Sequence, residues 1–385
     1  MIIKSLSVRN FRNIASADFI FDPKVNIFTG NNAQGKTNLC EAISVCLGKS
    51  FRNPKISEML PFGVSDCETA VETVFSFDNM KDKENTVLYT QKNNSYSLKF
   101  NGIEIKEAEK LYGALRYVLF IPEDLYIVKG TPEKRRDYID YVSNMINRVH
   151  NNKLYEYNKA LRQKNNILMK LTEYNYNVKL MLESWNETIA RYGVNVMCGR
   201  IRYFNLLAEA ADHFYGLLNG SGERLSMTYE SSVMGDTPFT ADDVDIMYNT
   251  YIERLRESSE RDIRMKYTTV GAHRDDISFC INDMPAKDYA SQGQIRSIAV
   301  ALKLAEAKLI TDKSGDYPVI ILDDVLSELD SYRRSFITKH IDDFQIFITS
   351  CNISDIENIG SGKIWKVENG SFTLKEGQNV SLSWK

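Results

Sequence analysis

The chain has 385 residues and a mass of 44.1 kDa, which is enough to bury one large core or two smaller ones. Its apolar fraction of 43% and charged fraction of 26% exclude wholesale disorder, and its net charge of −3 gives no global attraction to a polyanion. No apolar stretch approaches the roughly 18 residues of a membrane span and the N-terminus lacks the apolar run of a signal peptide, so we expect a cytoplasmic protein with no membrane partner.

The first 115 residues consist of short segments separated by turns. Residues 25–29 form a β-rich run that ends at Gly30. The next segment, residues 38–47, has helical periodicity. Three later segments have the pattern of antiparallel strands: residues 69–77, 86–91 and 95–101. This region therefore predicts an α/β domain.

The turn between that first strand and helix fits the pattern GxxxxGK[ST] at every fixed position. Glycines are needed where backbone N–H groups wrap phosphate oxygens, and the helix N-terminus that follows faces the same anion. The lysine ammonium reaches the β- and γ-phosphates and the final hydroxyl coordinates Mg²⁺, so we predict Lys36 as a catalytic residue and Thr37 as a metal ligand in an ATP site. The predicted ATP-binding residues are Gly30, Asn31, Asn32, Ala33, Gln34, Gly35, Lys36, Thr37 and Asn38.

The predicted secondary structure changes after an apolar strand at residues 117–121. From about residue 132 to residue 218 the pattern is helical, with apolar positions three or four apart but no sustained heptads, which predicts a compact domain. Strand patterns return at Met265. The layout predicts an α/β domain built from both chain ends around a mainly helical insertion, with boundaries at 1–120, 121–264 and 265–385.

The helical insertion has an uneven charge distribution. Residues 129–202 contain 14 Lys and Arg against 7 Asp and Glu, whereas residues 203–264 contain 5 against 12. Solvated helix faces explain such runs, although a basic segment is also where a polyanion could dock.

A second anion-facing feature precedes the helix predicted at residues 295–310. Ser291, Gln292, Gly293 and Gln294 stand at its start. An ordinary helix cap explains a serine there. The N–H groups of a helix start also bind anions. One ATP needs only one phosphate loop, so this turn makes sense if it closes on the γ-phosphate held by a second copy of the chain.

Two carboxylates end the apolar run at residues 317–322. Such a run suits a strand buried on both faces of a parallel sheet. Charge at its C-terminal end fits a Mg²⁺ bound to nucleotide, with Asp323 on the metal side and Asp324 placed to polarise the attacking water. A pair of helix N-caps is the alternative explanation. The preceding phosphate loop favours the catalytic one.

The order of these motifs resembles ABC-type ATPase heads, among them those of SMC proteins. Ser291–Gln294 resembles the ABC signature, with Gln292 in place of the usual glycine, and Ser327–Asp330 resembles the D-loop, marking Ser327 and Asp330. Asp324 stands where most such heads have Glu, which implies slow turnover. Thr349 and Ser350 stand where many heads carry a switch histidine.

Further motifs narrow the resemblance to the RecF family of bacterial DNA replication and repair proteins. They span residues 10 to 330 and comprise Asn10–Asn13, Pro122–Leu125, Gly130–Pro132 with Arg135 and Arg136, and Gly271–Asp276, where Ala272 replaces a common proline. The family implies a weak ATPase that dimerises on ATP and binds gapped DNA or single-/double-strand junctions. It also implies RecR and RecO as partners in recombinational repair and a link to the SOS response.

Several accessory residues have two explanations each. Arg12 lies early enough to reach the nucleotide, or it is a surface cation. Phe11 is predicted to belong to the core. His273 and Arg274 lie near nucleotide or DNA, or form a structural ion pair with Asp275. Contacts to the DNA backbone are assigned to Lys134, Arg135 and Arg136.

Two other classes of protein compete with this hypothesis. A small-molecule kinase or a GTPase would also need a phosphate loop, but the chain has no NKxD guanine-recognition motif and a signature turn has no role in a monomeric kinase. A structural SMC protein with long arms is disfavoured because the insertion of about 145 residues lacks the heptads of a coiled coil.

Overall fold

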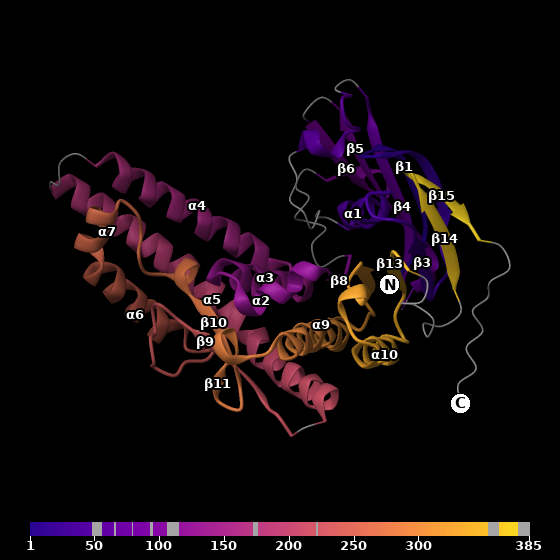
Figure 1. The fold of residues 1–385 in the computed structure, drawn as a ribbon. Helices are drawn as coiled ribbons and strands as arrows, with labels where there is room; N and C mark the ends of the chain where they lie inside the picture. The colour runs from indigo at the N-terminus through magenta and orange to yellow at the C-terminus, as the bar shows by residue number, and fades with distance from the viewer. Residues whose placement is uncertain are drawn as a thin grey trace. The chain divides into compact units, whose positions relative to one another are not determined.

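The computed structural model divides the chain into two units (Figure 1). The first unit joins both ends of the chain, residues 1–124 and 300–385, and the second contains residues 125–299. The described residues are 1–47, 56–64, 67–78, 80–92, 95–105, 115–171, 176–220, 222–352 and 362–375. Among them, no helix is both long and apolar enough to span a bilayer.

A mixed six-stranded sheet forms the centre of the first unit. Its strands lie in the order β15-β14-β3-β13-β12-β8, parallel except for β15. Every residue of β3, β8, β12 and β13 is buried, as expected for parallel strands covered on both faces. The bounds are β3 Val25–Thr29, β8 Tyr117–Phe120, β12 Val319–Asp323, β13 Ile346–Ser350, β14 Lys363–Glu368 and β15 Ser371–Leu374. Strand β3 therefore pairs on both sides with strands that follow it by more than 300 residues.

An antiparallel sheet completes the first unit, in the order β2-β1-β4-β5-β6-β7. The helix α1 (Lys36–Cys46) contacts strands of both sheets, and its apolar side chains are buried between them. Aromatic rings from both chain ends, Phe19, Phe28, Trp365 and Phe372, pack together, which is why the indigo and yellow strands lie side by side in Figure 1. The bounds are β1 Ile2–Phe11, β2 Ile14–Ile20, β4 Thr69–Phe77, β5 Met80–Lys92, β6 Ser95–Phe100 and β7 Ile103–Glu104.

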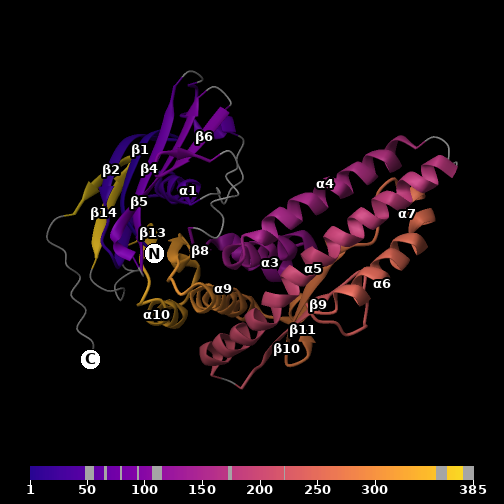
Figure 2. The same ribbon diagram turned by 180° about the vertical axis from the view of Figure 1, so that it is seen from behind.

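The second unit is mainly helical. Its long helices α4 and α5 lie side by side (Figure 2), and α6 packs against α5 around a core that includes Tyr157, Met197 and Tyr251. A small antiparallel sheet, β11-β10-β9, lies on this core. The helices are α2 Tyr126–Lys129, α3 Pro132–Ile146, α4 Val149–Lys170, α5 Tyr176–Asn219, α6 Val244–Glu257, α7 Ser259–Met265 and α8 Ala286–Tyr289. The strands are β9 Leu225–Glu230, β10 Asp276–Ile281 and β11 Met284–Pro285.

The insertion extends further toward the C-terminus than the sequence predicts. It starts at Leu125 rather than at residue 121, and it ends at Ala299 rather than at residue 264. The reason is that β10 pairs with β9 and Asp276 pairs with α3, which ties residues 265–299 to the helices. The boundary falls inside α9 (Gln292–Ser314), so Ser291–Gln294 belong to the second unit and not to the α/β domain.

Candidate functional site

The phosphate loop connects β3 to α1, and two of its glycines are sterically required. A Cβ at Gly30 would lie 2.3 Å from the carbonyl oxygen of Val367, and a Cβ at Gly35 would lie 2.8 Å from Oδ1 of Asn13. Gly35 is also the residue before α1 and has a φ of 113°, in the region that favours glycine. The loop therefore adopts the tight, backbone-lined turn that the motif predicts.

Lys36 lies over this loop. Its ammonium donates to the carbonyl oxygens of Gly30 at 2.5 Å and Asn31 at 2.9 Å, and it lies 3.4 Å from Sγ of Cys351. The residue is only 5% exposed, so the charge is held at one place beside the backbone N–H groups of the loop. An anion bound at the N-terminus of α1 would meet this charge directly.

Residues far away in the sequence support the loop at Gln34. Its carbonyl oxygen accepts from Nδ2 of Asn13 at 3.1 Å and from the N–H of Gly370 at 2.8 Å. Its side-chain Oε1 accepts from the N–H of Asn369 at 2.7 Å. The turn between β14 and β15 thus fixes the phosphate loop from outside, a role that the sequence did not suggest.

Two hydroxyls converge on Asp323 at the end of β12. Thr37 Oγ1 donates to Asp323 Oδ1 at 3.1 Å, and Thr349 Oγ1 donates to the same oxygen at 2.7 Å. Strand pairing places Thr349 opposite Asp323. A hydroxyl and a carboxylate at the edge of a phosphate loop are hard oxygen ligands of the kind that Mg²⁺ takes alongside phosphate oxygens and water. The predicted pair Thr37 and Asp323 therefore fits this metal.

Asp324 has an unusual backbone conformation, with a φ of 54°. Its N–H donates to Thr349, at 2.9 Å to the hydroxyl and 3.3 Å to the carbonyl oxygen. Its carbonyl oxygen accepts from Ser327 Oγ at 2.7 Å, so the predicted D-loop serine supports it from the other side. The carboxylate is half-buried and its Oδ1 lies 3.8 Å from Cys351 Sγ. A role for Cys351 was not predicted from the sequence.

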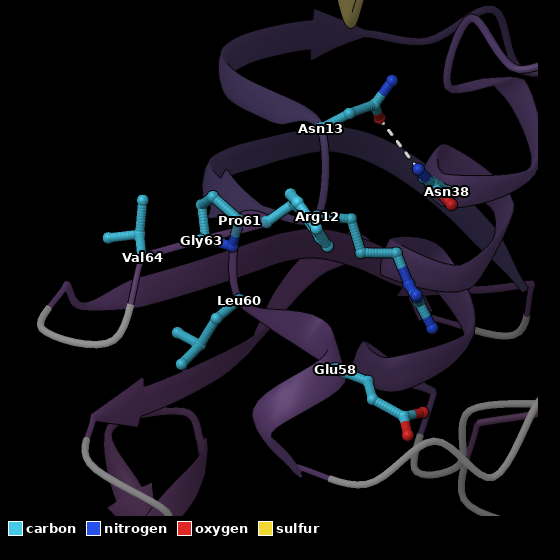
Figure 3. Close-up of a pocket in the computed structure, with 9 residues that line it drawn as sticks. Arg12, Asn13, Asn38, Glu58, Leu60, Pro61, Gly63 and Val64 are labelled. Carbon is cyan, nitrogen blue, oxygen red and sulfur yellow. Dashed lines mark hydrogen bonds between the residues drawn. The ribbon is translucent and has the colours of Figure 1, made fainter.

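A pocket of about 820 Å³ opens beside the phosphate loop (Figure 3). Arg12, Asn13 and Asn38 line it, and Asn38 donates to Asn13 at 2.8 Å. Arg12 pairs with the fully buried Glu41, with Nη2 at 2.9 Å from Oε1, so it is not a free surface cation. The remaining lining residues are Glu58, Leu60, Pro61, Phe62, Gly63 and Val64, none of which was predicted.

The signature turn forms a reciprocal helix cap. The Ser291 N–H donates to Oε1 of Gln294 at 2.9 Å, and the Gln294 N–H donates to Ser291 Oγ at 3.2 Å. Ser291 and Gln292 are exposed, and Gln294 also donates to Glu223 at 3.1 Å. The helix-cap explanation is thus present in the geometry, and the exposed turn also remains open to a partner.

Asp330, the other predicted D-loop residue, caps a helix. Its Oδ1 accepts from the N–H of Arg333 at 2.8 Å at the start of α10 (Ser331–His340). The aspartate itself is exposed. Its cap explains its presence without a nucleotide.

The basic residues of α3 differ from one another. Arg135 is buried and holds Asp276 with Nε at 2.6 Å and Nη2 at 2.9 Å, so the expectation that it contacts DNA is corrected to a structural ion pair. Arg136 is half-buried and donates to the Asp275 carbonyl oxygen at 2.8 Å. Lys134 is exposed. The charge pattern could not separate these positions, because the partners lie about 140 residues away.

The segment Gly271–Asp276 lies inside the second unit. Asp275 is fully buried and accepts from Tyr229 Oη at 2.6 Å and from the Ser232 N–H at 2.9 Å. His273 bonds to Tyr157 Oη at 2.7 Å, and burial lowers its pKa to about 4. The geometry supports a structural role for this motif but not the predicted ion pair. His273 also bonds to the carbonyl oxygen of Thr268 at 3.0 Å, and Arg274 donates to the same oxygen at 3.3 Å. The cation beside Asp275 is Arg200, at 3.9 Å. Phe11 is fully buried, as predicted.

Comparison with known proteins assigns the arrangement to a family. The family model for the RecF/RecN/SMC N terminal domain matches residues 2–370. The DNA replication and repair protein RecF of Ruminiclostridium cellulolyticum is 36% identical over 379 residues, covering 97% of this chain and 99% of the relative. The chain belongs to the RecF family. The RecF protein of Lachnospira eligens is 35% identical over 375 residues, covering 96% and 98%.

Solved structures extend the comparison to the fold. Two structures of the recombination mediator protein RecF in the RecFOR pathway, one with ATP and one with ATPrS, each match at a TM-score of 0.88 and 32% identity, covering 97% of both chains. An SMC head bound to the C-winged helix domain of ScpA matches at a TM-score of 0.56 and 14% identity. The ABC-type ATPase head and the RecF resemblance predicted from the motifs are confirmed.

Proposed function

We propose that this RecF-family chain binds ATP·Mg²⁺, dimerises on it and hydrolyses it slowly while bound to gapped or junction DNA in the cytoplasm. The observation that carries the proposal is that Lys36 and Thr37, which follow β3, lie at the same edge of the sheet as Asp323 at the end of β12. Relatives that match over nearly the whole chain were solved with ATP and ATPrS, which supports this nucleotide. In this proposal RecR- and RecO-type proteins are its partners in recombinational repair.

The nucleotide occupies two adjoining regions in this proposal. The phosphates lie on residues 30–37, where Lys36 supplies the charge and the N-terminus of α1 supplies N–H donors. The nucleoside lies in the pocket lined by Arg12 and Asn38. Phe62, which is fully exposed at its rim, offers an aromatic face to a base. Glu41 fixes the guanidinium of Arg12 at this position.

Asp323 and Asp324 have different roles in the proposed hydrolysis. Mg²⁺, when bound, neutralises charge on the phosphates. Thr37 and Asp323 are its ligands, and Asp324 accepts a proton from the attacking water. An aspartate reaches one methylene less far than a glutamate. This difference supports slow turnover.

The second copy supplies the other half of the site. The exposed turn Ser291–Gln294 presents a helix start that binds the γ-phosphate held by the partner's loop. In this proposal Ser327 and Asp330 also contact the second copy. Hydrolysis removes the phosphate that joins the two copies, so the dimer separates.

Contacts to DNA are proposed for the exposed Lys134 and the half-buried Arg136. They lie in the segment with an excess of basic residues, residues 129–202. Binding through phosphates predicts an affinity that falls steeply with salt.

Light scattering after size exclusion tests the proposal. The wild type should be monomeric without nucleotide and dimeric with ATP·Mg²⁺, and Lys36→Arg should show less dimer at the same ATP concentration. Gapped duplex should then raise the rate of ATP hydrolysis above that with intact duplex. A wild type that binds ATP but stays monomeric refutes the site shared between two copies, and a rate indifferent to DNA favours a small-molecule kinase or GTPase.

A further inference from the structure

The end of β13 lies between the two halves of the phosphate site. In the sheet, β13 pairs with β3 on one side and with β12 on the other. The phosphate loop follows β3 and the two carboxylates follow β12. Residues at the end of β13 therefore form a second connection between the loop and the carboxylates, beside the direct bond of Thr37 to Asp323.

Thr349 uses its hydroxyl both as donor and as acceptor to fix the carboxylate pair. Its Oγ1 donates to Asp323 Oδ1 at 2.7 Å and accepts from the Asp324 N–H at 2.9 Å. The side chain is fully buried, so water does not replace these bonds. One group thus sets both the metal-side carboxylate and the backbone of the water-side one.

Asp324 needs this support because of its backbone. A φ of 54° lies in the left-handed region, which is strained for a non-glycine residue. The hydrogen bond to Thr349 and the bond from Ser327 hold the conformation in place. If the bond to Thr349 is lost, the peptide relaxes toward ordinary φ values and the carboxylate of Asp324 turns away from the loop.

Cys351 extends the connection to the loop itself. Its thiol donates to Asn32 Oδ1 at 2.7 Å, and its sulfur lies 3.4 Å from Lys36 Nζ and 3.8 Å from Asp324 Oδ1. A change in the position of Lys36 or Asn32 when phosphate binds therefore also moves Cys351, which contacts Asp324.

We propose that Thr349 is a positioning residue for ATP hydrolysis, and that Cys351 links the phosphate loop to the Asp324 that Thr349 holds. The inference rests on the proposed ATP site. It assigns to the end of β13 the step by which occupation of the loop brings Asp324 into its working position. Neither side chain touches the reacting atoms in this scheme.

Steady-state kinetics on Thr349→Val tests the inference. This change keeps the shape and removes the hydroxyl, so kcat should fall by about 10- to 100-fold, as for other groups that orient a metal ligand, while KM for ATP stays within about twofold. Thr349→Ser should recover most of kcat because it restores the hydroxyl. Thr73→Val, a buried threonine of β4, is the matched control and should change neither constant.

Labelling of Cys351 with a maleimide supplies a second measurement that does not depend on a variant that folds poorly. ATP should protect Cys351 in the wild type, whereas the half-buried Cys280 of the second unit should label at the same rate with and without ATP. Cys351→Ala should lower kcat more than Cys351→Ser, since serine keeps a donor to Asn32.

The outcomes separate this inference from the proposed function. A wild type that does not bind ATP overturns the proposed function. A wild type that binds and hydrolyses ATP, together with a Thr349→Val variant of unchanged kcat, overturns the positioning role alone. A rise in KM at constant kcat also overturns it, because the hydroxyl would then act in binding. Labelling of Cys351 that ATP does not slow removes the link to the loop.

Discussion

The phosphate loop of the first unit and the segment Gly271–Asp276 of the second both carry dense family motifs, yet they differ in where their polar groups are directed. At the loop, Lys36 and Thr37 bond only to groups of the phosphate site itself, the loop carbonyl oxygens and Asp323, and the adjoining Asn38 lines a pocket that a ligand can enter. In the second unit, Asp275 and His273 are bonded to other residues of the same chain. A motif can thus belong to a ligand site or to the structural core, and the partners of its polar atoms distinguish the two cases.

The buried cluster of the second unit shows how scaffold of this kind is balanced. Burial alone raises the pKa of Asp140, but the bidentate Arg200, at 2.8 Å from each oxygen, and His150 lower it well below its usual range. Arg200 also donates to the carbonyl oxygen of Ala272 at 2.6 Å, which joins the cluster to the motif. This arrangement leaves little room for a ligand.

Removing Arg200 should produce the largest effect on stability. Arg200→Met leaves Asp140 charged and buried without its main partner, so unfolding of the second unit should become easier by about 3–5 kcal/mol. Hydrogen exchange of peptides from residues 125–299 measures this, while ATP binding by the folded protein stays within twofold. Arg224→Met, which removes an exposed pair with Asp212, is the control and should cost at most about 1 kcal/mol. Equal protection in both variants would mean that the cluster is not structural.

Removing Lys36 should have the opposite effects: a large loss of activity and little change in stability. Lys36→Ala takes away the charge that meets the phosphates, so kcat/KM for ATP should fall by about 10²–10³, the range for one electrostatic group at a reacting centre. The melting temperature without nucleotide should change little, because within the described part of the chain the ammonium bonds only to carbonyl oxygens and a sulfur at the loop. Lys4→Ala, at an exposed pair with Glu84, should leave both quantities unchanged.

Acid should weaken the second unit through His273. Its pKa is lowered from 6.5 to about 4, chiefly by burial, so the unfolded chain takes up the proton more readily. This contribution to stability is present above pH 6.5 and is lost as the pH falls toward 4, by about 2–3 kcal/mol between pH 7 and 4.5. Urea unfolding of wild type and His273→Gln at both pH values isolates it, since the carboxylates titrate alike in both proteins. A pH dependence equal in the two proteins would contradict the assignment.

The smallest effect on stability is expected at Asp330, which caps a helix and is also predicted to belong to the D-loop. Asp330→Ala removes the cap of α10 and should lower the stability of the first unit by about 1 kcal/mol, whereas Asp330→Asn, which can still cap, should lower it by much less. Thermal unfolding measures both. If Asp330→Asn nonetheless loses ATP-dependent dimerisation, the residue serves the D-loop as well as the cap.

Local patterns predicted the elements of the sheet and the phosphate loop well. The bounds of β3 and β4 agree with the sequence because short apolar runs and flanking turns define them. The support of Gln34 by Asn369 and Gly370 could not be predicted, since it depends on β14 lying next to β3. Thr349 and Cys351 were missed as partners of the carboxylates for the same reason: strand order is a non-local property. The burial of Arg135 needed Asp276, which lies 141 residues away.

The pairing of β3 with β13 and β14 has a consequence for synthesis on the ribosome. The second unit, residues 125–299, is contiguous, so its contacts can form while the chain is still growing. The phosphate loop must wait until residues 346–368 have emerged, more than 300 residues after β3. At about 5–20 residues per second this delay lasts roughly 15–65 s. During that interval the apolar strand β3 lacks both neighbours, so it is exposed to misfolding and to binding by a chaperone.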